Sequence, residues 1–487
     1  MNINSKIKKG LSWSFLNQGY SLLSQFTLGI WLARILGPEV YGTVAMVTVF
    51  SSLAQMFLDF GFSAALVQKQ NVSKEDYSTI FWFNLVVSII IFVLFFISSN
   101  LIADFYGKPE LSTYAKVIGA QFVFSAFAIT QSVQLTKKID FKSKTIISIL
   151  SSIISFALAL ILAYNGFGVW SIIAQILCNK VISVILLYSL VSWTPMFYFS
   201  RRSFNSFYKF GLSVTADTFL NYLARNIDNI LIGKYLGDTQ LGFYSKSYSI
   251  ILFPIRNFSA VIKQILFPSF SLIQNDISLI RMYYLKTTGM ILYIIPPIMI
   301  LLSMNAEEIV MILFGKDWIS MAPLVEVFSI LGIVQSILTL NGTIYLSLGK
   351  AALAFKLGLL STTVSIIAIS IGVYLGDIYS VAIALGLAQI IITYPILNTA
   401  LKLINLNLLS FLKYNYKLFL INALAFAIAY IVKSIVVCSN IFLLVGVISA
   451  IYLFIYLLLS NMIKIEPYRF IINRIKTVFS DFFRKEF

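Results

Sequence analysis

Long apolar runs recur along almost the whole chain, and they constrain its fold more than any other feature. The stretches Ile80–Leu101, Ile146–Tyr164 and Leu357–Leu375 contain no charged residue. A transmembrane α-helix needs about 20 mostly apolar residues to cross the hydrocarbon core of a bilayer. Only 11% of the residues are charged, whereas a soluble domain has about 25%. The sequence therefore predicts an all-α, multi-pass membrane protein.

The apolar runs predict fourteen transmembrane helices. Their expected ranges are 11–34, 40–64, 79–101, 113–135, 145–164, 168–192, 210–234, 243–268, 286–304, 323–347, 356–375, 380–401, 416–434 and 440–461. We expect an arrangement of two six-helix bundles over residues 1–200 and 201–410, two further helices over 411–463, and an amphipathic cytoplasmic tail over 464–487. The tail and the segment 198–210 mix basic with aromatic or aliphatic residues, which predicts helices lying in the membrane interface.

Basic residues are divided unequally between the two sets of loops. When residues near the span ends are counted with the adjoining loop, 25 of the 36 Lys and Arg residues lie on one side, seven lie on the other and four lie deep inside spans. This asymmetry follows the positive-inside rule, so we expect both termini in the cytoplasm and an even number of spans. The net charge of +17 thus reflects membrane topology, and we expect no nucleic-acid partner.

Residue types that serve metal and redox chemistry are scarce. The chain has no histidine, and its two cysteines, Cys178 and Cys438, lie far apart in the sequence. Neither a Cys/His metal site nor a disulfide framework can be built from them. We therefore predict no cofactor, no metal ion and no catalytic residue. The apolar stretch after Lys6–Lys9 is too long for the core of a cleavable signal peptide, so we expect the first span to remain.

A nine-residue pattern occurs twice. Arg34–Gly42 reads RILGPEVYG, and Lys234–Gly242, 200 residues later, reads KYLGDTQLG. Both place a basic residue, a Leu-Gly pair and a second glycine at the same spacing, at the outer end of an odd-numbered span. The first six and the next six spans are therefore predicted to be two copies, related by a pseudo-twofold axis along the membrane normal. Chance similarity between two glycine-containing turns is the alternative.

Charged and polar residues inside the spans are the candidates for function, because a charge near mid-bilayer costs about 2.5–3.5 kcal/mol. Away from the span ends, three acidic residues lie inside spans, against four basic ones, and this surplus of cations predicts an anionic ligand such as a phosphate. The candidate substrate-binding residues are Arg225, Arg256, Lys263, Asn221, Gln18, Gln25 and Gln55. The candidate residues for coupling to a proton or Na⁺ are Asp59, Asp217 and Asp228.

Both groups of candidates have a structural alternative. Neutral side chains such as Gln and Asn commonly form hydrogen bonds between transmembrane helices. Arg225 lies close enough along its helix to neutralise Asp228 or Asp217 in a permanent ion pair. Arg256 and Lys263 have no acidic residue within their own span, so for them we favour a polar cavity.

Several stretches, in this order and spacing, resemble the bacterial polysaccharide flippases, the Wzx and WzxC-like members of the MOP exporter superfamily. They include Leu32–Gly42, Asp59–Gln68, Asn226–Gly233 and Pro254–Ser259. The resemblance implies a two-lobed helical fold, alternating access and a cargo of undecaprenyl-diphosphate-linked oligosaccharide. It implies a place in the bacterial inner membrane and transport from the cytoplasmic to the periplasmic leaflet for O-antigen, capsule or exopolysaccharide assembly, beside a polysaccharide polymerase and other assembly proteins. Arg256, within the Pro254–Ser259 match, is the position to which a role in holding the diphosphate is carried over.

Two other functions compete with this one. An ion-coupled exporter of small drug-like cations on the same superfamily fold should have a cavity dominated by acidic residues, whereas the surplus here is basic. A membrane polysaccharide polymerase or ligase should have a long outer loop with Arg or His for catalysis, and the longest predicted outer loop is only 305–322. We therefore predict a transporter.

Overall fold

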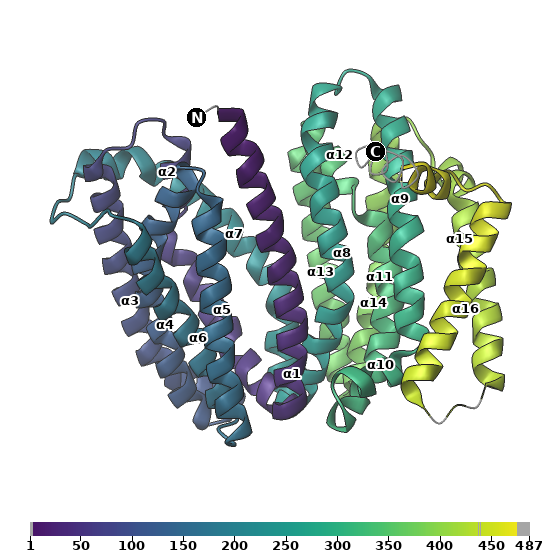
Figure 1. Ribbon diagram of the computed structural model, residues 1–487, viewed down its shortest axis with the longest axis horizontal. Helices are drawn as coiled ribbons and strands as arrows, with labels where there is room; N and C mark the ends of the chain where they lie inside the picture. The colour runs from purple at the N-terminus through teal and green to yellow at the C-terminus, as the bar shows by residue number, and fades with distance from the viewer. Residues whose placement is uncertain (1–2, 437, 439, 475–487) are drawn as a thin grey trace, which may run out of the picture. The chain divides into compact units, whose positions relative to one another are not determined.

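The computed structural model describes residues 3–436, 438 and 440–474, and every regular element within them is a helix (Figure 1). The prediction of an all-α membrane protein is confirmed. The chain forms two compact units, Met1–Gly242 and Phe243–Phe487. Compactness is a different property from sequence repetition, so the predicted bundle boundary near residue 200 remains a prediction, as does the pseudo-twofold axis.

The first unit contains seven helices in its described residues. They are α1 (Ile3–Asp59), α2 (Phe62–Gln68), α3 (Lys74–Tyr106), α4 (Glu110–Lys137), α5 (Phe141–Tyr164), α6 (Val169–Leu190) and α7 (Arg201–Leu236). The long α1 covers two predicted spans, which meet at Gly37 without an intervening loop. Gly37 has φ 75° and ψ 173°, a conformation that is open almost only to glycine. Pro38 follows, where its fixed φ suits the start of the next helical stretch.

Twelve helices in the described part of the chain are long and apolar enough to cross a membrane. The first, Ser12–Gln68, includes both predicted spans that α1 joins. Helix α7 is not among the twelve, because its many polar residues lower its hydropathy. The count of fourteen therefore remains a prediction, while the multi-pass character of the chain is clear.

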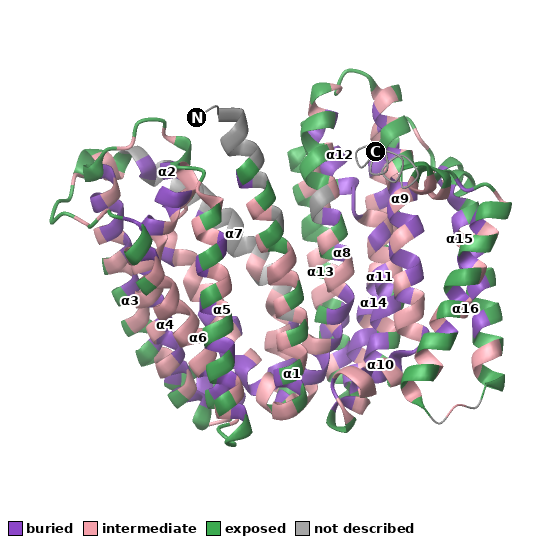
Figure 2. Ribbon diagram, in the orientation of Figure 1, coloured by how far each residue is buried: buried purple, intermediate pink, exposed green. Residues whose placement is uncertain are grey.

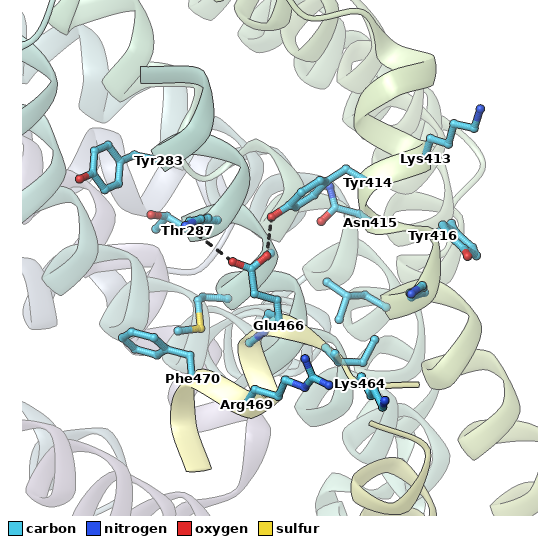
Figure 3. A pocket seen from close by; sticks show the side chains of 17 residues that line it. Tyr283, Thr287, Lys413, Tyr414, Asn415, Tyr416, Lys464, Glu466, Arg469 and Phe470 are labelled. Carbon is cyan, nitrogen blue, oxygen red and sulfur yellow. Dashed lines mark hydrogen bonds and ion pairs between the residues drawn. The ribbon is translucent and has the colours of Figure 1, made fainter. Parts of the chain in front are cut away.

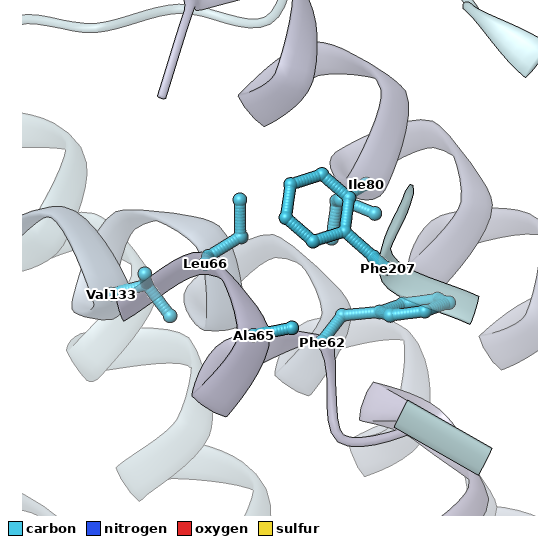
Figure 4. Close-up of a cluster of buried hydrophobic side chains, with 6 residues drawn as sticks. All are labelled: Phe62, Ala65, Leu66, Ile80, Val133 and Phe207. Atoms are coloured by element: carbon cyan, nitrogen blue, oxygen red, sulfur yellow. The ribbon is translucent and has the colours of Figure 1, made fainter. Parts of the chain in front are cut away.

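An aromatic and aliphatic cluster joins four helices of the first unit at the end with the basic loops. It consists of Phe62, Ala65, Leu66, Ile80, Val133 and Phe207 (Figure 4). Phe207 lies in the segment that was predicted to lie flat in the membrane interface, yet it is buried here and its helix continues as α7. Phe204 and Phe207 of the predicted interfacial segment therefore pack on protein. Lys137 donates hydrogen bonds to the carbonyl oxygens of Leu66, a member of this cluster, and of Lys69 at the end of α2.

The second unit consists mostly of α8 and later elements. They are α8 (Asp238–Leu272), which begins in the first unit, α9 (Ile277–Met304), α10 (Ala306–Leu313), the 3₁₀ helix η1 (Lys316–Met321), α11 (Ala322–Leu338), α12 (Asn341–Ser347), α13 (Ala351–Tyr374), α14 (Ile378–Leu403), α15 (Leu408–Ile435) and α16 (Ile441–Met462). Buried hydroxyls hold α15 and α16 to this unit: Tyr452 donates to Asn422 Oδ1 at 2.9 Å, and Tyr456 donates to the Tyr293 carbonyl at 2.8 Å.

Many exposed residues of both units are large and apolar, and Figure 2 shows where the exposed residues lie. Ile97 and Leu101 on α3 are 68% and 69% exposed, although they are large and aliphatic. Contiguous apolar surface of this kind is rare on proteins in water. It fits helices whose outer faces contact hydrocarbon.

Candidate functional site

The two copies of the nine-residue pattern lie together at one end of the first unit. Gly37 and Gly237 have the same unusual backbone, with φ 75° and ψ 173° in one and φ 88° and ψ 177° in the other. Gly42 lies directly on the backbone of Asp238, and Gly242 lies directly on the backbone of Pro38. A Cβ atom on either second glycine would overlap a carbonyl group. The spacing of the pattern is thus explained by two turns that interlock.

Ionic contacts surround these turns. The Asp238 carboxylate forms an ion pair with Lys108 from the α3–α4 connection, and it accepts a hydrogen bond from Thr43 Oγ1 at 3.1 Å. Lys234 donates to the Phe105 carbonyl and lies 4.9 Å from the centre of its ring. Burial lowers the pKa of Lys108, but the hydrogen bond and charge of Asp238 outweigh it and raise the pKa above its ordinary value of 10.5.

A separate cavity of about 700 Å³ lies inside the first unit, between α2, α4, α5 and α6. Its polar lining residues are Ser63, Gln68, Ser125, Ser132, Thr136, Lys144, Asn179, Lys180 and Ser183. None of the described residues that line it is acidic. It is the strongest candidate in this unit for holding a polar, negatively charged group.

Two lysines give this cavity its charge. Lys144, near the start of α5, donates to Thr136 Oγ1 at 2.8 Å, and Lys180 lies midway along α6. Neither forms an ion pair in the described part of the chain. The hydroxyl oxygen of Ser125 is buried in the cavity wall without a hydrogen-bond partner. Ammonium groups and a free hydroxyl offer the donors that phosphate oxygens accept.

Asp59 lies next to this cavity, because it is hydrogen-bonded to Ser63, one of the lining residues. It is the last residue of α1, because the chain turns at Phe60 and Gly61, both with positive φ, before α2 begins. The carboxylate accepts hydrogen bonds from the Ser63 amide at 3.1 Å and from Ser63 Oγ at 2.9 Å. The predicted span 40–64 is therefore interrupted, and Asp59 sits at a helix junction with local partners. Its role in ion coupling remains a prediction.

The three predicted glutamines fall in different environments. Gln55 Nε2 donates to Gln121 Oε1 on α4 at 2.6 Å, the interhelical bond that was the alternative to a binding role. Gln18 is exposed on α1. The side chain of Gln25 lies outside the described part of the structure.

The candidate residues in the predicted span 210–234 all fall on α7. The side chains of Asp217, Asn221 and Arg225 lie outside the described part of the structure. Asp228 is buried, and its Oδ1 accepts the amide proton of Asn229 at 2.8 Å. The predicted pairing of an arginine with these acids is therefore untested.

Arg256 and Lys263 both have exposed side chains on α8, two turns apart. Arg256 forms no ion pair with any described residue. Pro254 lies within the helix just before Arg256 and removes one backbone hydrogen bond there. The exposed positions are compatible with contact to a ligand.

Sequence reasoning missed two groups of residues that the fold brings together. Lys144 was counted only as a basic loop residue that sets topology, because nothing in the sequence shows that it turns inward toward α6. Lys108 and Asp238 lie 130 residues apart, and no spacing rule links them. The one usable signal was Lys180, a charge in the middle of an apolar helix with no acid nearby.

Fold and cavity together define a multi-pass helical membrane protein with a cationic cavity inside one unit. A family model described as "Polysaccharide biosynthesis protein" matches residues 31–323, more than half of the chain. The chain belongs to this family of polysaccharide biosynthesis proteins, as its resemblance to the WzxC-like flippases predicted.

Individual proteins agree with this assignment. The chain is 28% identical to the teichuronic acid biosynthesis protein TuaB of Bacillus subtilis (strain 168), over 73% of this chain and 74% of TuaB. It is 25% identical to the lipopolysaccharide biosynthesis protein WzxC of Escherichia coli (strain K12), over 81% of this chain and 80% of WzxC. Among solved structures, the lipid II flippase MurJ in an inward closed conformation matches with a TM-score of 0.73 at 16% identity, covering 95% of this chain and 100% of MurJ.

Proposed function

We propose that this protein flips lipid-linked oligosaccharides, carried on undecaprenyl diphosphate, from the cytoplasmic leaflet to the opposite leaflet for the assembly of a surface polysaccharide. Alternating access moves the hydrophilic head through the protein while the lipid tail stays in the bilayer. The observation that carries the proposal is family membership combined with two cations inside apolar helices, Lys180 and Arg256, which form no ion pair with any described residue. Such cations are costly in a membrane, and an anionic cargo repays that cost.

Each set of charged residues has a role in this proposal. Arg225, Arg256 and Lys263 contact the diphosphate, for which arginine provides a forked donor. Lys144 and Lys180 provide positive charge in the cavity of the first unit, where polar hydroxyls and Asn179 accommodate sugar groups. Asp59, Asp217 and Asp228 are the groups available for coupling transport to a proton or Na⁺.

Arg256→Ala tests the proposal in cells that depend on this protein for a surface glycan. We expect surface glycan to fall about tenfold, since a hydrogen bond to a charged group contributes about 1.5–3 kcal/mol. Lipid-linked repeat units should accumulate on the cytoplasmic side at unchanged protein level. Arg202→Ala, which removes an exposed arginine at the start of α7, is the matched control and should leave glycan output unchanged.

The same cells separate the flippase from its alternatives. Normal glycan output with Arg256→Ala would remove that residue from transport. Normal glycan output after deletion of the whole protein, together with increased sensitivity to cationic drugs, would instead indicate a small-molecule exporter.

A further inference from the structure

The second unit contains a cavity of about 740 Å³ that shares no lining residue with the cavity of the first unit. Its walls are the first part of α9, the first part of α15 and the segment Lys464–Phe470 that follows α16 (Figure 3). These are the helix ends that the distribution of basic residues assigns to the cytoplasmic side. None of the predicted substrate-binding residues lines it.

Basic side chains dominate the lining of this cavity. It contains Lys286, Lys413, Lys417, Lys464 and Arg469. Glu466 is the one acidic residue among the described lining residues, and it is already engaged. Its carboxylate accepts a hydrogen bond from the Tyr414 hydroxyl at 3.0 Å and lies 3.8 Å from the Lys286 ammonium group (Figure 3). Lys413, Lys417, Lys464 and Arg469 form no ion pair with any described residue, so they are available to an anionic ligand.

A buried amide adds a hydrogen-bond acceptor. Asn415 is fully buried at the cavity wall, and its Nδ2 donates to the Phe411 carbonyl at 3.0 Å. Its Oδ1 atom has no hydrogen-bond partner. Gly289 faces that atom, and a Cβ there would lie 3.7 Å from Oδ1. Leaving a buried acceptor unpaired is unfavourable, so this oxygen fits a ligand that supplies a hydroxyl or amine donor.

The position of the cavity favours a ligand that is part of a lipid. Tyr283, Tyr416 and Phe470 are exposed around it, and lysines extend among them. Aromatic rings and long basic side chains at the end of apolar helices are typical of the membrane interface. Met290 and Leu418 make part of the lining apolar. The phosphates of lipid headgroups lie in the membrane interface.

We propose that this cavity binds the phosphodiester headgroup of an anionic phospholipid from the cytoplasmic leaflet, with the basic side chains on the phosphate and Asn415 Oδ1 accepting a headgroup hydroxyl. Phosphatidylglycerol has both groups. None of the residues proposed to bind the glycan carrier lines this cavity, and the proposal does not depend on the proposed flippase function. Binding there ties α9 and α15 to the segment after α16.

The test measures lipid retained by the full-length protein after purification in detergent, using native mass spectrometry with added phosphatidylglycerol. Removing three of the cations with Lys413→Gln, Lys417→Gln and Arg469→Gln together should weaken binding at least about tenfold, since each basic residue attracts an anionic headgroup. The matched control removes three exposed cations outside the cavity, Lys350→Gln, Lys356→Gln and Lys402→Gln, and should change binding less than about twofold. Equal losses in the two triple variants would overturn the proposal.

A second variant narrows the cavity without changing charge. Gly289→Leu places its Cβ in ordinary van der Waals contact with Asn415, Pro467 and Tyr414, and the rest of the side chain adds bulk at this wall. It should abolish retention, whereas Gly358→Leu on α13, where nothing lies within 4 Å of the added Cβ, should not. Retention by a folded Gly289→Leu protein would contradict the assignment.

Two further ligands identify the source of the phosphate. Soluble sn-glycerol 3-phosphate at millimolar concentration should fail to displace the phospholipid, and displacement would make the cavity a site for free phosphate compounds instead. Phosphatidic acid, which lacks the headgroup hydroxyl, should bind more weakly than phosphatidylglycerol. Equal binding of these two lipids would rule out the proposed contact with Asn415.

Discussion

Gly42 and Gly242 interlock two turns of the first unit, because each glycine lies on the backbone at the start of the other turn, at Asp238 and Pro38. The turns have equivalent glycines, Gly37 and Gly237, in matching conformations. Two features of the repeated pattern thus have separate physical causes. The first glycine of each copy adopts backbone angles that are open almost only to glycine. The second glycine allows the backbone of the other turn to approach closely.

Gly42→Ala should destabilise the protein, since the new methyl group overlaps the Asp238 carbonyl and the backbone must move. Overpacking of this kind costs about 1–3 kcal/mol. Thermal unfolding in detergent measures the effect. Gly29→Ala on the same helix is the control, because nothing lies within 4 Å of its added Cβ. Equal midpoints for the two variants would mean that the turns do not require close contact.

Gly237→Ala should also destabilise the protein, although no atom lies within 4 Å of the added Cβ. The cost of about 1–3 kcal/mol arises from the backbone angle alone. Here the comparison is Gly358→Ala, which also has open space but lies in a regular helix. If both variants unfold at the same temperature, the backbone angle at Gly237 carries no strain for alanine.

Asp238→Asn should lower stability by about 1–3 kcal/mol, because it leaves the half-buried Lys108 ammonium without its partner. The Lys108→Met, Asp238→Asn double variant should recover part of this loss. Additive losses in unfolding free energy would show that the pair is not coupled.

The same ion pair predicts a pH dependence. The pKa of Lys108 is raised in the folded protein above its ordinary value of 10.5. The stabilisation is therefore complete below pH 10.5 and is lost as pH rises through the folded pKa. Unfolding midpoints of the wild type and of the double variant should converge above that range. A constant difference between them would indicate that Lys108 does not titrate there.

Lys180→Gln should reduce transport while leaving the folded protein at least as stable, because it removes a costly cation from the middle of α6. Surface glycan and the unfolding midpoint are the two readouts. The exposed Lys356→Gln is the control for charge and should preserve both. A loss of stability in Lys180→Gln would show that this lysine stabilises the folded protein, which would contradict a role in binding the cargo.

Much of the fold is predictable from the sequence, because the bilayer demands long apolar helices and sets their orientation through charge. Junctions are harder to predict. The break after Asp59 depends on positive φ at Phe60, which no residue preference signals. The inward turn of Lys144 and the contact of Gln55 with Gln121 depend on how helices pack, and a single sequence contains no information on that rotation.

The interlocked glycines also limit how this chain can change over evolutionary time. A larger residue at either position needs space that only a shift in the other turn can provide. Substitutions at Gly42 and Gly242 are therefore expected to be accepted together or not at all. Among homologous sequences, the two positions should covary despite their wide separation along the chain.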